Sequence, residues 1–141
     1  MNSEYIFMKQ ASGETHLIDS QGNTVTSSKT PVQILEQCCL KYGSTMRGRM
    51  EAACMLLGIR QKPPVLISEA TGEIWFGTTS MKDKSCEWYS YHHLLHIVSR
   101  NGRTEVLFMN GISVETDTDV RILRRQMERC EHLLRILSDE S

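Results

Sequence analysis

Short runs of alternating apolar and polar residues occupy the first part of the chain and predict three β-strands. The runs cover residues 5–8, 15–18 and 23–26, and turn-forming residues at Ser12-Gly13 and at 20–22 separate them. Alternation with a period of two is typical of strands that bury one face. We therefore expect a small antiparallel meander at the N-terminal end of the chain.

Two helices are predicted to follow this meander. Thr30 and Gln33 have the spacing of a capping box, and Gly43 supplies a stop signal for the first helix. The second helix is expected over residues 44–58, where apolar residues recur three or four positions apart. Ser44 is the expected N-cap of this second helix.

The remainder of the chain reads as short strands and one final helix. Lys62-Pro63-Pro64 ends helical structure, and Asn101-Gly102 and Asn110-Gly111 are strong signals for tight hairpin turns. The predicted strands cover residues 65–67, 73–76, 86–89, 94–98, 104–108 and 112–114, and the last helix runs from about Asp119 to Leu137. The chain is thus expected to be a single α+β domain over residues 1–141, with antiparallel sheet, β-hairpins and about three helices.

Apolar residues of the last predicted helix form one seam with alternating spacings of three and four. They are Val120, Leu123, Met127, Cys130, Leu134 and Leu137. Such a seam packs either into the core of its own domain or against a second copy of the chain. Both alternatives remain open, and we take Leu123, Met127, Cys130 and Leu134 as the candidate dimer interface.

Composition and charge limit the class of protein. The chain has 141 residues, 40% of them hydrophobic and 23% charged, with a net charge of −1. These values suit one compact domain and exclude a long basic tail or an acidic disordered arm. Residues 44–62 nevertheless carry a local net charge of +3, so binding to a polyanion would use a local patch.

The cysteines and the lengths of the apolar runs bear on location. The five cysteines are odd in number and contain no Cys-x-x-Cys pair, which favours reduced thiols over a disulfide framework. No apolar run approaches the roughly 18–20 residues that a membrane span requires. We therefore expect a cytoplasmic protein without a membrane segment.

Arg47 and Arg49 lie in the first turn of the second predicted helix. The free N–H groups and the dipole at a helix start already attract anions, so arginine there indicates a negative partner. That partner is either a phosphate or one of the nearby carboxylates of Glu36 and Glu51. The sequence leaves both alternatives open.

Further basic and hydroxyl side chains are candidates for contact with DNA. Loop residues with hydroxyl groups can donate to phosphate, although solvated loops have the same composition. Arginines beside an Asn-Gly turn can enter a nucleic-acid groove from a hairpin tip. The full candidate set is Arg47, Arg49, Lys62, Thr78, Ser80, Lys82, Lys84, Arg100 and Arg103.

A metal site or a catalytic pair is weakly indicated. Cys86 with His92, His93 or His96 has ligand types that zinc accepts, but no second cysteine or carboxylate falls at a familiar spacing. Neither a nucleophile elbow nor a glycine-rich phosphate loop accompanies these residues. We expect no catalytic residue, no metal ligand and no cofactor.

Taken in order, several of these motifs resemble the ComK family of competence transcription factors. They are Tyr42-Gly43-Ser44, Gly48-Arg49, Lys62-Pro63-Pro64, Phe76 with Thr78 and Ser80, Cys86 with Trp88, Ser90 and His92, Phe108 with Asn110-Gly111, and Gln126 with Arg129. The resemblance is strongest over residues 31–135. The family's usual proline after Phe76 is Gly77 here.

The resemblance implies a cytoplasmic transcriptional regulator that binds AT-rich double-stranded DNA, chiefly through the minor groove, as a dimer or a pair of dimers. It implies neither catalysis nor a cofactor. A few well-placed Arg and Lys side chains can read the narrow, negative minor groove of A·T-rich DNA. The alternative is a family member that binds DNA weakly or not at all and acts through a regulatory protein partner, for example by forming mixed dimers with a fuller ComK protein.

Overall fold

The computed structural model describes residues 4–138 and confirms an α+β fold. Within these residues it contains three α-helices, one short 3-10 helix and nine strands. In chain order they are β1 (Tyr5–Ala11), β2 (Glu14–Asp19), β3 (Thr24–Ser27), α1 (Pro31–Lys41), α2 (Met46–Leu57), β4 (Val65–Ser68), β5 (Glu73–Gly77), β6 (Glu87–Ser90), η1 (Tyr91–His93), β7 (Leu94–Arg100), β8 (Arg103–Phe108), β9 (Ser113–Thr116) and α3 (Val120–Ser138).

The strands form two antiparallel sheets. A six-stranded sheet has the order β3-β2-β1-β6-β5-β4, and a three-stranded sheet has the order β7-β8-β9. Strand β6 pairs with β1 on one side and with β5 on the other. The predicted N-terminal meander and the predicted β4–β5 hairpin are therefore joined through a strand that comes later in the chain.

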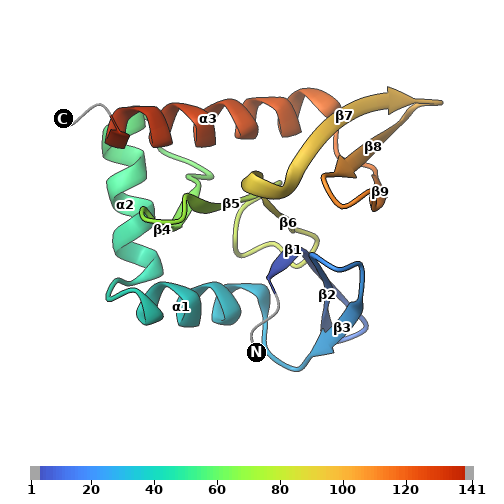
Figure 1. Cartoon of the computed structure of the whole chain (residues 1–141), viewed down its shortest axis with the longest axis horizontal. Helices are drawn as coiled ribbons and strands as arrows, with labels where there is room; N and C mark the ends of the chain where they lie inside the picture. The colour runs from blue at the N-terminus through green and yellow to red at the C-terminus, as the bar shows by residue number, and fades with distance from the viewer. Residues whose placement is uncertain (1–3, 139–141) are drawn as a thin grey trace.

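The six-stranded sheet is covered on both faces, as Figure 1 shows. Side chains of β4 and β5 alternate between two apolar clusters: Leu66 and Ile74 enter one, whereas Val65 and Trp75 enter the other. Helix α3 and the three-stranded sheet contribute to the first cluster, and α1 contributes to the second. Because both faces are covered, all four residues of β4 are buried.

The starts of the helices follow local hydrogen bonding. The Thr30 hydroxyl accepts from the Gln33 N–H while the Gln33 side chain accepts from the Thr30 N–H, which confirms the capping box. The expectation that Ser44 caps α2 is wrong. Thr45 is the N-cap, because its hydroxyl accepts from the Gly48 N–H, whereas the Ser44 hydroxyl donates to the Cys39 carbonyl.

The apolar seam of α3 belongs to the core of this domain. Leu123 and Cys130 are fully buried, and Met127 and Leu134 are half-buried against the same cluster. Leu123 and Cys130 therefore have no surface to offer a second copy, which corrects their assignment to a dimer interface. The physical reason is that α3 covers one whole face of the six-stranded sheet.

Candidate nucleic-acid interface

The two arginines at the start of α2 have different surroundings. Arg47 is almost fully exposed, and its Nε lies 3.5 Å from the Glu51 carboxylate one turn later. Arg49 is largely covered; its Nε donates to the Ser44 hydroxyl at 3.0 Å, and its guanidinium lies 3.3 Å from Glu69 in the turn after β4. Arg49 thus ties α2 to the sheet, whereas Arg47 projects into solvent.

The loop that links β5 and β6 is anchored at its two ends. Thr78 is only 2% exposed, and its hydroxyl accepts from the Glu87 N–H at 3.0 Å. The buried Thr78 hydroxyl therefore serves the fold and is not available to DNA, which corrects its assignment as a DNA contact. Toward the other end, the Ser85 hydroxyl and N–H donate to the Asp83 carboxylate and lower the pKa of Asp83.

Between these anchors, Ser80, Lys82 and Lys84 are exposed. The Ser80 hydroxyl accepts from the Lys82 N–H at 3.3 Å, which closes a local turn. Asp83 lies between the two lysines in sequence and stays ionised at neutral pH because of its lowered pKa. The loop therefore presents two cations and one anion to solvent.

The segment after α2 is held by α3. The Gln126 side-chain amide donates to the carbonyl oxygens of Lys62 at 3.1 Å and Gly77 at 2.8 Å. Arg129 donates to the carbonyl oxygens of Gln61 and Lys62. Gln126 and Arg129, two residues that the resemblance singled out, thus fix the backbone of this segment.

These elements enclose a concave surface that we call the α2 groove. It consists of two adjoining hollows of about 1,110 and 600 Å³ between α2, residues 60–63 and the start of the β5–β6 loop. Of the sequence candidates, it brings together Arg47, Lys62, Thr78, Ser80 and Lys82. It also includes Arg60, which the sequence analysis missed as a site residue because no motif marks it.

Arg100 and Arg103 lie elsewhere, at the exposed tip of the β7–β8 hairpin, which projects from the body of the protein (Figure 1). Asn101 and Gly102 between them have φ values of 53° and 78°, which confirms the tight turn predicted at this Asn-Gly pair. Arg100 lies 3.5 Å from Glu105, and Arg103 lies 3.2 Å from Asp117. The basic candidates therefore form two separate sets.

The base of this hairpin is fixed to the six-stranded sheet through Glu87. One carboxylate oxygen of Glu87 accepts from the hydroxyls of Thr116 at 2.6 Å, Tyr89 at 3.1 Å and Thr118 at 3.3 Å. The Thr104 hydroxyl in β8 donates to the Thr118 carbonyl oxygen at 2.7 Å. These contacts set the direction in which the arginine tip projects.

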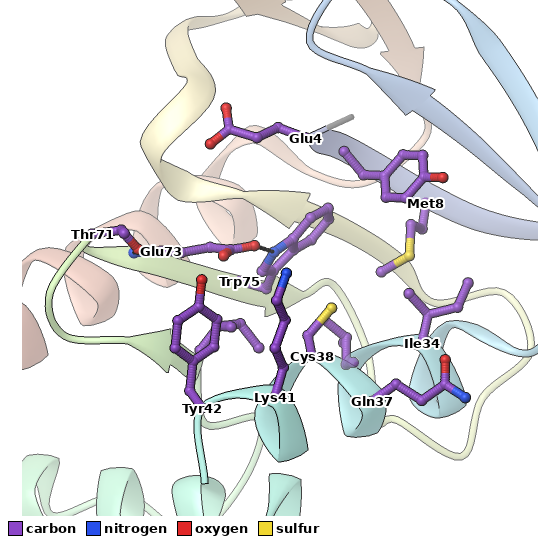
Figure 2. Close-up of a pocket in the computed structure, with 13 residues that line it drawn as sticks. Glu4, Met8, Ile34, Gln37, Cys38, Lys41, Tyr42, Thr71, Glu73 and Trp75 are labelled. Carbon is purple, nitrogen blue, oxygen red and sulfur yellow. Dashed lines mark hydrogen bonds between the residues drawn. The ribbon is translucent and has the colours of Figure 1, made fainter. Parts of the chain in front are cut away.

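A further hollow of about 500 Å³ lies between α1 and strands β1, β4 and β5. Figure 2 shows Lys41 reaching from α1 toward Trp75, with Glu73 beside the indole ring. The Trp75 Nε1 donates to the Glu73 carboxylate at 3.3 Å. Glu4 and Glu73 outnumber the single cation Lys41 in this lining, so the hollow does not favour phosphate and we leave it out of the candidate interface.

The cysteines are free thiols. Burial raises the pKa of Cys38, of Cys130 and of Cys39, the last to about 11, so these thiols stay protonated at neutral pH. Cys86 packs beside Gly77 and Trp88. Over residues 4–138, no three His, Cys, Asp or Glu side chains gather into a group that could hold a metal ion.

The fold and the site define an α+β domain with two separate sets of exposed basic side chains, one in a groove and one at a hairpin tip. The family model described as "ComK protein" matches residues 5–141, and the chain therefore belongs to the ComK family. The resemblance stated from the sequence is thereby confirmed.

One curated relative adds to this result. The Competence transcription factor of Bacillus subtilis (strain 168) is 28% identical over 100 residues, which cover 70% of this chain and 52% of that protein. The matched part thus spans about half the length of the relative. No solved structure matches the chain significantly. None of the helices in the described part of the chain combines the length and the apolar character that a membrane crossing requires.

Proposed function

We propose that this protein is a transcriptional regulator that binds AT-rich double-stranded DNA, chiefly through the minor groove. Membership in the ComK family and the relative named a competence transcription factor support the role of regulator. The observation that carries the DNA contact is the pair Arg100 and Arg103 at the projecting hairpin tip. In this role the protein acts in the cytoplasm, carries out no catalysis and needs no cofactor.

The dimensions of the hairpin favour contact through its tip. Adjacent strands lie about 4.8 Å apart before side chains are added. The minor groove of B-DNA is only about 6 Å wide, so a two-stranded ribbon does not fit into it, whereas arginine side chains do. A-tracts narrow the groove further and strengthen its negative potential, which attracts arginine. Arg100 and Arg103 are placed to respond to this potential.

The carboxylates beside the basic residues do not prevent DNA binding. The Arg47–Glu51, Arg100–Glu105 and Arg103–Asp117 pairs involve largely exposed side chains. Exposed ion pairs of this kind contribute about 0–1 kcal/mol each, so a phosphate or a groove edge can replace the carboxylate at little cost.

Arg47, Arg60, Lys82 and Lys84 are proposed as phosphate contacts. Their exposed cations surround or adjoin the α2 groove. Phosphate contacts set position and affinity without reading sequence, whereas contacts in the DNA groove set sequence preference. The two sets of basic residues are therefore assigned different tasks, and this difference can be measured.

Self-association as a dimer or a pair of dimers remains part of the proposal. The fully buried residues of the α3 seam cannot form the interface in this fold. Paired AT boxes would suit a two-fold assembly that presents two hairpin tips at a fixed spacing.

A second candidate function is regulation through protein contact, with weak or no DNA binding. It is favoured by the net charge of −1 and by the carboxylates that neutralise Arg47, Arg49, Arg100 and Arg103. In this case the partner is a protein, such as a fuller family member.

Fluorescence anisotropy with AT-rich and GC-rich duplexes of equal length, at several salt concentrations, tests the proposal. The wild-type protein should prefer the AT-rich duplex, and log K should fall linearly with log salt concentration. Arg100→Ala/Arg103→Ala should lose affinity by roughly tenfold or more and lose the preference for AT. Lys82→Ala/Lys84→Ala should weaken both duplexes equally and lower the salt slope by about one per lost contact.

Arg125→Ala is the matched control, because Arg125 is exposed on α3, outside both sets. It should bind like the wild type. Failure of the wild-type protein to bind either duplex at any salt concentration would reject DNA binding and leave the second candidate. Binding that the hairpin variant retains in full would reject the role of the tip.

A further inference from the structure

Exposed apolar side chains gather along α2 and the loop facing it. Met55 is 85% exposed, Leu56 44% and Met81 36%. Single apolar residues on a surface are ordinary, but a contiguous group indicates a contact site. Methionine is flexible and polarisable, so methionine-rich surfaces adapt to the apolar side chains of protein partners.

The larger hollow of the α2 groove has an apolar lining. Its apolar members are Met46, Met50, Cys54, Met55, Pro63 and Met81, and together with charged residues they enclose about 1,110 Å³. This volume exceeds the roughly 300–1,000 Å³ of pockets for small ligands. Met50, Arg60, Pro63 and Met81 also line the adjoining hollow, so the groove continues past one end. An extended, open shape suits a segment of polypeptide.

The rim of the groove is mainly basic. Arg47, Arg60 and Lys82 line it, against Glu36 and Glu51. Glu51 is paired with Arg47, and within residues 4–138 neither Arg60 nor Lys82 forms an ion pair with a carboxylate. DNA phosphates would satisfy these cations but would leave the methionine lining without apolar contacts. An occupant that is both apolar and acidic satisfies both parts of the groove.

We propose that the α2 groove docks an amphipathic helix of a partner protein, with an apolar stripe and flanking acidic residues. Apolar side chains three and four positions apart would enter the methionine lining, which is the helix-in-groove mode of recognition. The acidic residues would face Arg60 and Lys82. A second copy of this chain fits less well, because it would bring the same arginines and lysine toward this rim, and the exposed face of α3 carries Arg121, Arg124 and Arg125.

The probe for this proposal is a synthetic helical peptide with leucines at helical spacing and flanking glutamates. Two comparison peptides carry lysine in place of glutamate or the same residues in scrambled order. Binding is followed through the methyl signals of ¹³C-labelled methionines, without DNA, so the result does not depend on the proposed DNA function. The signals of Met50, Met55 and Met81 should shift in a saturable way with the acidic peptide only.

Variants then locate the site. Met55→Glu should weaken binding of the acidic peptide by about tenfold or more, and because Met55 is exposed the variant should remain folded. Met109→Glu is the matched control, since Met109 is also exposed but lies after β8, outside the groove lining. Arg60→Glu/Lys82→Glu should shift the preference toward the lysine peptide. Arg125→Glu should leave it unchanged.

Three results would overturn the proposal. The first is no saturable binding of the acidic amphipathic peptide. The second is equal binding of the scrambled or the lysine peptide to the wild-type protein. The third is binding that Met55→Glu and Met109→Glu affect alike, which would place the contact outside the α2 groove. Sedimentation of the wild-type protein as a dimer that Met55→Glu converts to a monomer would assign the groove to a second copy and reject the partner helix.

Discussion

Gln126 provides the sharpest test of how α3 positions the α2 groove. This side chain is 1% exposed and donates to two backbone carbonyl oxygens on different elements, those of Lys62 and Gly77. Gln126→Met keeps nearly the same length and volume but removes both donors. The substitution therefore isolates the hydrogen bonds from the packing of α3.

The expected loss follows from what each carbonyl retains. The Lys62 oxygen keeps its bond from Arg129 at 3.3 Å, so losing the Gln126 donor there costs about 1 kcal/mol. The buried Gly77 oxygen loses its side-chain donor, and a buried acceptor left without a partner costs about 1–3 kcal/mol. The total is about 2–4 kcal/mol, which lowers the melting temperature of a domain of this size by roughly 6–15 °C.

Urea unfolding monitored by circular dichroism measures this loss, with the slope of the transition checked for two-state behaviour. Gln21→Met is the control, because Gln21 is exposed and its substitution should change stability by less than about 0.5 kcal/mol. Gln126→Glu should cost more than Gln126→Met at neutral pH, since a carboxylate cannot donate and would face two carbonyl oxygens. If Gln126→Met is as stable as the control, the reasoning from these hydrogen bonds is refuted.

Three further predictions concern other parts of the fold. Gly77→Ala should cost about 1–3 kcal/mol, because an added Cβ would lie 2.8 Å from the buried Cys86 sulfur; calorimetry should show a smaller cost in a Cys86→Ala background, and equal costs would contradict this cause. Hydrogen bonds from Arg121 lower the pKa of Asp119 to about 2, so the stabilisation by Asp119 is present above about pH 4 and is lost as the pH falls through 2. Thermal melts should show Asp119→Ala destabilised at pH 7 with the difference shrinking toward pH 2, whereas a difference independent of pH would argue against the ion pair. Met127→Glu should unfold the domain, as circular dichroism would show, whereas a folded variant that sediments as a monomer would restore an interface on α3.

Features that depend on neighbouring residues were predictable from the sequence. The capping box of Thr30 and Gln33 is closed by hydrogen bonds within one turn. The turn at Asn101-Gly102 needs only two residues that tolerate positive φ. Even so, the shift of the α2 N-cap from Ser44 to Thr45 depended on a contact of Ser44 with the end of α1.

The sequence also determined the candidate basic residues but not their availability. Thr78 and Lys82 look alike as polar loop residues, yet one is buried against Glu87 and the other is exposed. Likewise, Arg47 and Arg49 are two positions apart, and only Arg49 reaches Glu69 after β4. No local pattern distinguishes the members of these pairs, because burial depends on which distant segment packs beside them.

By itself, the sequence determined the α+β class, the helices, the tight turns and the family, since local hydrogen bonding and the order of motifs are written along the chain. Only the tertiary structure decided that β6 inserts between β1 and β5 and that the α3 seam is core. It also decided that Arg60 and Lys82 face a methionine-lined groove. These features arise from contacts between residues far apart in sequence, whose pairing minimises exposed apolar surface over the whole domain rather than within any one segment.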